Sequence, residues 1–376
     1  MVTGSSTDEV AHARKLVLAY GWNAVCFQIL NPGFSYWFSP EGDAVVGFVR
    51  DPVRRIRVVG GAPICAQERL TSVVQAWEAE SRQAGDDVCY LCAADRLLEA
   101  LRSGQFSLHH ASVSLGAQPI WNPQRWPTIL AAQSSLRQQI RRAANKGVRV
   151  EEWEPVRAAA APELRACLEG WLVARHLPPL RFLAEPHTLD RLEERRVFVA
   201  ERAGNVVGFL IASPVPCRVG WLFEQVIRCM DAPNGTAESL IDFAMRTVAD
   251  DGAEYVTLGL VPLAQRGTAI FPVQNPLWLR LVLAWARAHG RRFWNFDGLE
   301  AFKAKFHPEA WEPIFAIANR SRFTPRLLLG IARAFHPDAD RLSAPRAFAH
   351  IIGDALSQEF QRLRAPANEI RSTKSK

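Results

Sequence analysis

The stretch Phe293-Trp-Asn-Phe-Asp-Gly-Leu-Glu-Ala-Phe-Lys-Ala-Lys-Phe-His-Pro308, continued by Glu-Ala-Trp-Glu-Pro313, holds the most distinctive pattern of the chain. Its first four residues predict a short strand. Asp297 then stands where a helix N-cap belongs, three residues before Glu300, which is the spacing of a capping box. Pro308 ends the helix because proline cannot continue it. The stretch therefore predicts a strand, a tight turn and a short helix.

The two sides of this helix differ in polarity. Leu299, Phe302 and Phe306 recur at helical spacing and would face a core. The polar side chains of the stretch lie elsewhere: Asn295, Asp297, Lys303, Lys305 and His307. From spacing alone, two interpretations stay open, a solvated amphipathic helix or a helix that brings its lysines to a functional site.

Length and composition indicate a globular protein with more than one domain. The chain has 376 residues, of which 48% are apolar, including 12 Trp, so two domains with packed cores are expected. No run of 18 or more apolar residues occurs, which predicts no membrane span. Residues 1–9 lack the basic and apolar parts of a signal peptide. These features favour a cytoplasmic protein, with peripheral association at the membrane as an extension of that prediction.

The number of cysteines also favours a cytoplasmic protein. Seven cysteines, an odd number, are typical of reduced thiols in a cytosolic protein. Cys89 and Cys92 have the spacing of a metal or redox pair, but no second pair accompanies them and they lie in the apolar run 87–94. A buried strand is the better interpretation. The sequence predicts no metal site and no bound cofactor.

The positive charge is concentrated at one end. The net charge is +7, and residues 320–376 hold 11 Lys and Arg against 5 Asp and Glu, an excess of +6. A basic tail on a nearly neutral body is typical of proteins that contact an anionic surface, either lipid headgroups or nucleic acid.

The order of predicted elements divides the chain into four parts. Residues 1–126 and 148–319 each predict a helix, a three-strand meander and then alternating helices and strands, the order of an acetyltransferase-like fold. Between them, residues 127–147 predict one basic helix, and residues 320–376 predict a helical tail. We expect an α+β fold of two tandem acetyltransferase-like domains with mixed, mostly antiparallel sheets.

The basic helix is a candidate binding element. Arg141, Arg142 and Lys146 are spaced to lie largely on one of its faces. They are either part of a solvated linker or a face that contacts phosphates of tRNA or lipid.

The second half of the sequence contains two further distinctive motifs. Residues 221–240 place Glu224 and Arg228 before an Ala-Pro-Asn-Gly turn, and residues 255–263 end in Leu-Gly-Leu-Val-Pro-Leu. Together, the three ordered motifs resemble the catalytic C-terminal domain of the lysyl-phosphatidylglycerol synthase family (DUF2156). This resemblance implies a tandem acetyltransferase-like fold and transfer of an aminoacyl group. The donor would be aminoacyl-tRNA and the acceptor an anionic membrane lipid, such as phosphatidylglycerol, or another small molecule.

The resemblance and the residue chemistry suggest roles for single side chains. Glu224 and Arg228 lie four apart, so a regular strand would place both on one face, where they could hold an α-amino group and a phosphate or form a structural ion pair. Lys303 and Lys305 could contact phosphates or polarise the ester carbonyl, and His307 could carry a proton or simply end the helix.

The turn after that strand adds backbone donors. Asn234, Gly235 and Thr236 begin a predicted helix, whose first N–H groups could bind an anion or a carbonyl, or the turn could be an ordinary cap.

The chain also departs from the family pattern at Gln225, Trp294 and Ala62, where Asp, Tyr and Asp are common. Two other functions therefore stay open. An acyl-CoA-dependent acyltransferase would need a Gly-rich pyrophosphate loop, which the turn at residues 231–236 matches poorly. A non-catalytic module of the same fold would use the basic tail to dock on anionic lipid or tRNA.

Overall fold

A computed structural model describes residues 6–104, 106, 109–174, 181–264, 266 and 296–335. All of them belong to the first of two compact units, residues 1–335. The predicted helix 276–289, the predicted strand as far as residue 295, with Trp294 and Asn295, and the tail beyond residue 335 lie outside the described residues. Phe296, predicted as the last residue of that strand, instead begins helix α10 (Phe296–Ala304).

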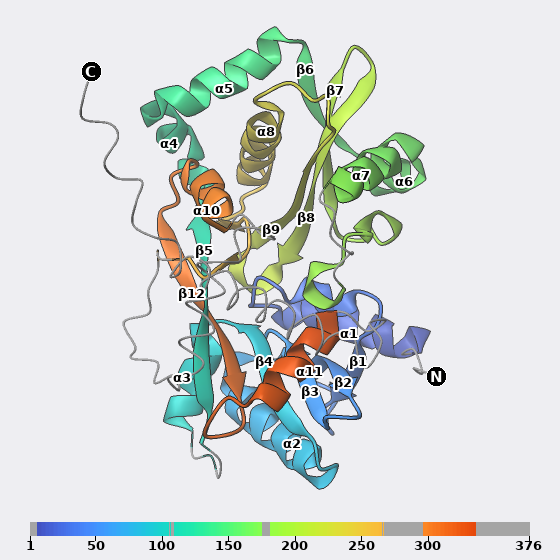
Figure 1. The fold of residues 1–376 in the computed structure, drawn as a ribbon, viewed down its shortest axis with the longest axis vertical. Helices are drawn as coiled ribbons and strands as arrows, with labels where there is room; N and C mark the ends of the chain where they lie inside the picture. The colour runs from blue at the N-terminus through green and yellow to red at the C-terminus, as the bar shows by residue number, and fades with distance from the viewer. Residues whose placement is uncertain are drawn as a thin grey trace, which may run out of the picture. The chain divides into compact units, whose positions relative to one another are not determined.

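The first half of the chain begins with helix α1 and ends with the long strand β5 (Figure 1). Its elements are α1 (Thr7–Tyr20), η1 (Phe27–Leu30), β1 (Ser35–Phe38), β2 (Val45–Asp51), β3 (Ile56–Gly60), η2 (Gln67–Arg69), α2 (Leu70–Gln83), β4 (Asp87–Ala93), α3 (Asp95–Ser103) and β5 (Ala111–Trp121).

The second half follows through two connecting helices. Its elements are η3 (Pro123–Arg125), α4 (Trp126–Ala132), α5 (Ser134–Asn145), β6 (Val148–Trp153), α6 (Pro155–Ala160), α7 (Pro162–Ala174), η4 (Phe182–Ala184), η5 (Thr188–Asp190), β7 (Arg196–Arg202), β8 (Asn205–Val215), η6 (Pro216–Arg218), β9 (Gly220–Arg228), α8 (Thr236–Asp250), β10 (Tyr255–Thr257), β11 (Val261–Pro262), α10 (Phe296–Ala304), β12 (Ala310–Ala318) and α11 (Pro325–Phe335).

The described strands form one continuous mixed sheet. Its order is β1-β2-β3-β4-β12-β5-β10-β9-β8-β7-β6, with β11 also pairing with β5. Within the described residues, β3 with β4 and β9 with β10 are the parallel pairs, and the other pairs are antiparallel. The predicted α+β class with a mostly antiparallel sheet is confirmed. The two halves share one sheet, however, because β12 lies between β4 and β5 of the first half (Figure 1).

Each half repeats the same acetyltransferase-like unit. In the first half, the meander β1-β2-β3 is followed by α2 and by β4, which returns parallel to β3. In the second half, the meander β7-β8-β9 is followed by α8 and by β10, parallel to β9. A helix between parallel strands is the connection that parallel pairing requires. The boundaries at residues 126, 147 and 319 stay a prediction.

The second-half sheet is covered on both faces, which explains why β8 is buried along most of its length. Phe198, Leu210 and Phe223 pack with α8 on one face, and Val197, Phe209 and Ile227 pack with α6 and α7 on the other. Alternate residues of a strand point to opposite faces. Figure 1 shows α8 and α7 on either side of these strands.

Two local predictions were wrong. The single basic helix predicted for residues 127–147 is two helices, broken at Gln133, whose φ and ψ are −110° and 88°. At this break, the Arg137 guanidinium donates to the carbonyls of Leu130, 2.9 Å away, and Ala131. Residues 310–318, for which no element was predicted, form the strand β12.

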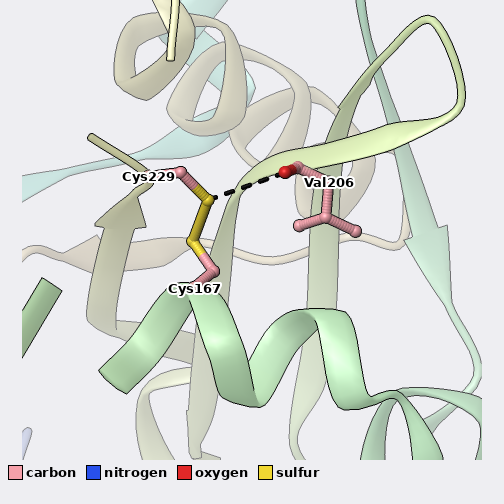
Figure 2. Close-up of a disulfide and its surroundings, with 3 residues drawn as sticks. All are labelled: Cys167, Val206 and Cys229. Atoms are coloured by element: carbon pink, nitrogen blue, oxygen red, sulfur yellow. Dashed lines mark hydrogen bonds between the residues drawn. A yellow bond between two sulfur atoms is a disulfide. The ribbon is translucent and has the colours of Figure 1, made fainter. Parts of the chain in front are cut away.

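The cysteines follow the prediction in part. Cys89 is fully buried in β4, so the buried-strand interpretation of Cys89 and Cys92 is confirmed. Cys167 of α7 and Cys229, which follows β9, are joined by a disulfide (Figure 2), so the expectation that all the cysteines are reduced was wrong. The Cys229 sulfur also lies 3.6 Å from the carbonyl oxygen of Val206 (Figure 2). The bond therefore fixes the end of β9 to the helix beside it.

The helices that the structure describes include none that combines the length and the apolar character needed to cross a bilayer.

Candidate active site

The candidate site begins where the parallel strands β9 and β10 separate. Their pairing joins Gly220–Leu222 to Tyr255–Thr257 and goes no further. The chain after Thr257 leaves to form β11, which pairs with β5 instead. Among the described strands, β9 beyond Leu222 therefore has a neighbour only on its β8 side. An open strand edge at the carboxyl end of a parallel pair is a position where α/β sheets bind ligands.

A β-bulge lies in this open part of β9. Phe223 pairs with Ala212 and Gln225 pairs with Ile211, so Glu224 is the extra residue of the bulged strand. Bulges bend a strand and turn its side chains to new directions, and they are frequent beside active sites.

Glu224 belongs to a buried polar network that joins the two halves. Its Oε1 accepts a hydrogen bond from Arg195 Nε at 2.8 Å, and its Oε2 accepts one from Gln28 Nε2 at 2.6 Å. Only 2% of the Arg195 side chain and 9% of the Glu224 side chain are exposed. Arg195 also donates to Ser213 Oγ at 3.0 Å and to Asn31 Oδ1 at 3.0 Å. The charge of Glu224 is thus balanced within the protein.

Two atoms of this network have no hydrogen-bond partner. They are Gln28 Oε1 and Asn31 Nδ2, both buried. Their amide orientations are set, because Gln28 must turn its NH2 group to the Glu224 carboxylate and Asn31 must turn its oxygen to the Arg195 guanidinium. A buried acceptor and a buried donor therefore remain open to a polar group of a ligand or to water.

The bulge separates Glu224 from Arg228. Gln225 bonds to the η5 region, donating to the carbonyls of Glu185 and Pro186 at 3.1 and 3.0 Å and accepting from Thr188 Oγ1 at 3.1 Å. Val226 then packs with the α8 cluster and Ile227 with the α7 cluster, so alternation assigns Arg228 to the α8 side. The expectation that Glu224 and Arg228 share a face was wrong, because a regular strand was assumed.

Arg228 lies beside the N-terminus of α8. A Cβ built on Gly208 would be 3.4 Å from both Arg228 Cα and Thr236 Cγ2, so the three residues are neighbours. Arg228 is exposed, and no described residue forms a hydrogen bond or ion pair with its guanidinium. It is therefore a cation available to a ligand.

The turn before α8 combines a left-handed glycine with unfilled backbone donors. Gly235 is the N-cap residue, with φ 98°, and no side chain caps the helix. Both hydrogen-bond donors of Thr236 are already used, since its N–H and its hydroxyl donate to the Pro233 carbonyl, at 3.2 and 2.7 Å. Asn234 is exposed. The first N–H groups of a helix lack intrahelical partners and attract negative charge, which adds to the charge of Arg228.

The basic helix α5 packs directly against this turn. A Cβ on Gly235 would lie 2.1 Å from the Gln139 carbonyl oxygen, so only glycine fits there. Arg141, Arg142 and Lys146 are exposed on α5, and their side chains form no hydrogen bond or ion pair within the described part of the chain. The structure thus brings α5, the start of α8 and Arg228 together on one side of the second half.

Lys303 lies inside the protein. It is 7% exposed, and its Nζ donates to the carbonyls of Leu258, Gly259 and Leu260 at 2.6, 2.9 and 3.1 Å. Burial lowers the pKa of Lys303 to about 7. The three carbonyls belong to the segment that turns away from β9, so the Lys303 Nζ fixes this segment where β9 and β10 separate.

Lys305 and His307 follow the end of the same helix, α10, which ends at Ala304. Lys305 pairs with Glu238 in the first turn of α8, and its Nζ lies 4.3 Å from the Phe302 ring centroid. His307 is exposed and has φ 50°, with its N–H bonded to the Ala304 carbonyl at 2.9 Å. Helix α10 begins at Phe296, one residue before the expected cap Asp297, whose side chain, like Asn295, lies outside the described residues.

The sequence missed the partners of Glu224. Arg195 lies just before β7, and Gln28 and Asn31 lie in and after η1 of the other half. No local motif marks these residues. The one available signal was a single uncharged amide, Gln28, in the otherwise apolar stretch Phe27–Leu30, which is buried throughout.

Comparison with known proteins now adds to this geometry. Residues 14–318 match the family model described as phosphatidylglycerol lysyltransferase, C-terminal. The chain belongs to this family. It is 24% identical over 299 residues to the phosphatidylglycerol lysyltransferase of Bacillus subtilis strain 168, covering 76% of this chain but only 32% of that protein.

Solved structures agree with the fold. The DUF2156 C-terminal domain from Agrobacterium fabrum superposes with a TM-score of 0.73 at 21% identity, over 89% of this chain and 99% of that one. The structure of L-PGS from Bacillus licheniformis superposes with a TM-score of 0.69 at 18% identity, over 86% and 95% of the two chains. At these identities the likeness shows the fold.

Proposed function

We propose that this chain transfers an aminoacyl group from aminoacyl-tRNA to an anionic lipid, or to another small acceptor. Family membership supports the class of reaction, and the observation that carries the proposal for the site is Arg228. Its guanidinium pairs with no described residue, and it lies beside the uncapped N-terminus of α8, at the edge of β9 that no described strand covers.

The reaction needs little beyond positioning and charge stabilisation. An acceptor oxygen attacks the carbonyl carbon of the aminoacyl ester, the bond to the ribose oxygen breaks, and the acceptor proton ends on that ribose oxygen. Negative charge develops on the carbonyl oxygen during the attack. Arg228 and the first N–H groups of α8 are suited to bind that oxygen or a phosphate next to it.

The basic helix α5 would receive the tRNA backbone. Arg141, Arg142 and Lys146 are exposed and form no ion pair with a described residue. Contacts from lysine and arginine to phosphates supply most of the affinity of nucleic-acid binding and make it depend on salt.

The polar network around Glu224 and the lysines of α10 would act as positioning groups. Glu224 is already paired with Arg195, so it offers hydrogen-bond acceptors rather than an unbalanced charge. Lys303 keeps the 258–260 segment away from β9, and Lys305 ties α10 to α8.

The sequence of the turn before α8 disfavours an acyl-CoA donor, because residues 231–236 match the Gly-rich pyrophosphate loop of such enzymes poorly.

A transfer assay tests the proposal. Charged total tRNA with labelled amino acids, the purified protein and liposomes are combined, and label is followed into the organic phase. We expect ribonuclease-sensitive transfer, and we expect Arg228→Ala to reduce it by about 100-fold, the scale of losing one oxyanion donor. Lys15→Ala, a change at an exposed lysine of α1 that forms no ion pair with a described residue, is the control and should be unaffected.

The double variant Arg141→Gln, Arg142→Gln separates binding from chemistry. It should weaken tRNA binding and lower the slope of log affinity against log salt by about 1 to 2, because each phosphate contact contributes about 0.7 to 0.9. Unchanged turnover in Arg228→Ala would refute the assigned site. Absence of both transfer and tRNA binding in the unmodified protein would favour the non-catalytic module.

A further inference from the structure

A pocket of the first half lies where the candidate active site lies in the second half. Strands β3 and β4 pair in parallel, and the chain leaves β3 through Gly61, which has φ 75° and donates its N–H to the Leu91 carbonyl at 2.7 Å. The carboxyl ends of β3 and β4 therefore correspond to those of β9 and β10. Ligands of open α/β sheets bind at such ends.

The pocket has an apolar wall and a small set of polar groups. Pro63, Leu70 and Leu97 form part of the apolar lining. Tyr20, Trp22, Asn23 and Arg96 supply the polar side chains, and no Asp or Glu is among the residues that line it. The lining thus carries a positive charge without a balancing negative one.

Arg96 is the main cationic group of the pocket. Its Nε is buried and has no hydrogen-bond partner. Its NH2 group makes one long bond, 3.4 Å, to the Cys65 carbonyl, and no described carboxylate pairs with it. The guanidinium carbon lies 5.2 Å from the Trp22 ring centroid, so the indole orients it. A buried donor of a charged group without a partner is costly, which favours a ligand that accepts from it.

Two further donors line the same pocket. Within the part of the chain that the structure describes, neither the Trp22 indole N–H nor the Tyr20 hydroxyl forms a hydrogen bond. Asn23 is already satisfied, since its Nδ2 donates to the Cys92 carbonyl at 2.9 Å and its Oδ1 accepts from the Val25 N–H at 3.1 Å. The open hydrogen-bonding capacity of the pocket is therefore that of donors.

We propose that this pocket binds the oxyanion of a small organic phosphate. Three donors on three different side chains suit a tetrahedral group with several acceptor oxygens better than a planar carboxylate with two. The apolar wall would contact the carbon part of the ligand. The same chemistry occurs in a soluble phosphate ester and in the phosphodiester of a lipid headgroup. The site is separate from the one proposed for aminoacyl transfer, and its assignment does not require that reaction.

Equilibrium dialysis with labelled sn-glycerol 3-phosphate tests the site, at low ionic strength and without tRNA. We expect saturable binding that Arg96→Gln weakens by about tenfold or more, the scale of a charged hydrogen bond. Arg149→Gln, a change at an exposed arginine of β6 that forms no ion pair with a described residue, serves as the control and should bind like the unmodified protein. Trp22→Phe keeps an aromatic face beside Arg96 but removes the N–H donor, and should weaken binding by a smaller factor. Circular dichroism establishes that each variant is folded.

The remaining arms identify the source of the phosphate. Competition by inorganic phosphate is expected, and competition by acetate is not. Sedimentation with phosphatidylglycerol vesicles but not phosphatidylcholine vesicles, dependent on Arg96, would assign a lipid headgroup. Binding of the soluble ester alone would assign a free metabolite. Equal binding by the unmodified protein and by folded Arg96→Gln, or no binding of any phosphate at millimolar concentration, would overturn the proposal. If Arg96-dependent binding occurs while no aminoacyl transfer is detected, the phosphate site is supported and the proposed function is refuted.

Discussion

Replacement of Lys303 by methionine should change how the stability of the protein depends on pH. The ordinary pKa of a lysine is 10.5, and burial lowers that of Lys303 to about 7 in the folded chain. Between these values the unfolded chain holds a proton that the folded chain does not. The free energy of unfolding therefore rises with pH across this window, and the stability is lost again as pH falls toward 7.

The magnitude follows from the two pKa values. One pH unit contributes at most about 1.4 kcal/mol, and about half of that slope applies at the folded pKa itself. From pH 7 to pH 9 the gain is about 2 kcal/mol for the unmodified protein, and it is absent in Lys303→Met. The difference in stability between the two proteins should therefore change by about 2 kcal/mol over this interval.

Urea unfolding at pH 7, 8 and 9 measures this difference, with fluorescence as the probe. Lys15→Met, a change at an exposed lysine of α1, is the control, and its curve should run parallel to that of the unmodified protein. Parallel curves for Lys303→Met as well would refute the reasoning. They would mean that the three carbonyls around Nζ keep the ammonium form in spite of its burial.

Two further predictions concern the frame of the site. Gly235→Ala should destabilise the protein by about 2 to 5 kcal/mol, because it combines a left-handed backbone with a collision against the Gln139 carbonyl. Gly204→Ala, also at positive φ but in open space, is its control and should cost only about 1 to 2 kcal/mol; similar losses at both sites would contradict the packing argument. Cys167→Ser should lower the free energy of unfolding by up to about 4 kcal/mol under oxidising conditions, since the disulfide closes a loop with a sequence separation of 62. A reducing agent should remove most of this difference, and an unchanged urea midpoint in Cys167→Ser would show that the bond adds no stability.

Much of the fold could be predicted from the sequence because its signals are local. The apolar run of β4, the meander β7-β8-β9 and helix α8 each have a period and end signals that need no knowledge of the rest of the chain. The break between α4 and α5 was not predicted, because Gln133 is neither glycine nor proline and nothing in the sequence marks the end of a helix there.

The site was harder to predict because its contacts are distant in sequence. Glu224 pairs with Arg195, 29 residues away, and with Gln28, 196 residues away. Its direction depends on a bulge, which is a property of the pairing with β8 and not of β9 alone. Lys303 was predicted to contact phosphates or the ester carbonyl, and its spacing could not reveal that its Nζ bonds to three backbone carbonyls of residues 258–260.

The position of β12 has a consequence for how this protein could have been assembled and how it can be divided. Its backbone bonds to β4 on one side and to β5 on the other, although β12 belongs to the second half of the chain and both of its neighbours belong to the first. A protein truncated before residue 310 would leave the facing edges of β4 and β5 unpaired, and unpaired edges promote aggregation. Recombination at the linker could therefore not exchange one half for another without supplying a matching strand. The two acetyltransferase-like units repeat one architecture, but the first unit depends on a strand from the second for a complete sheet.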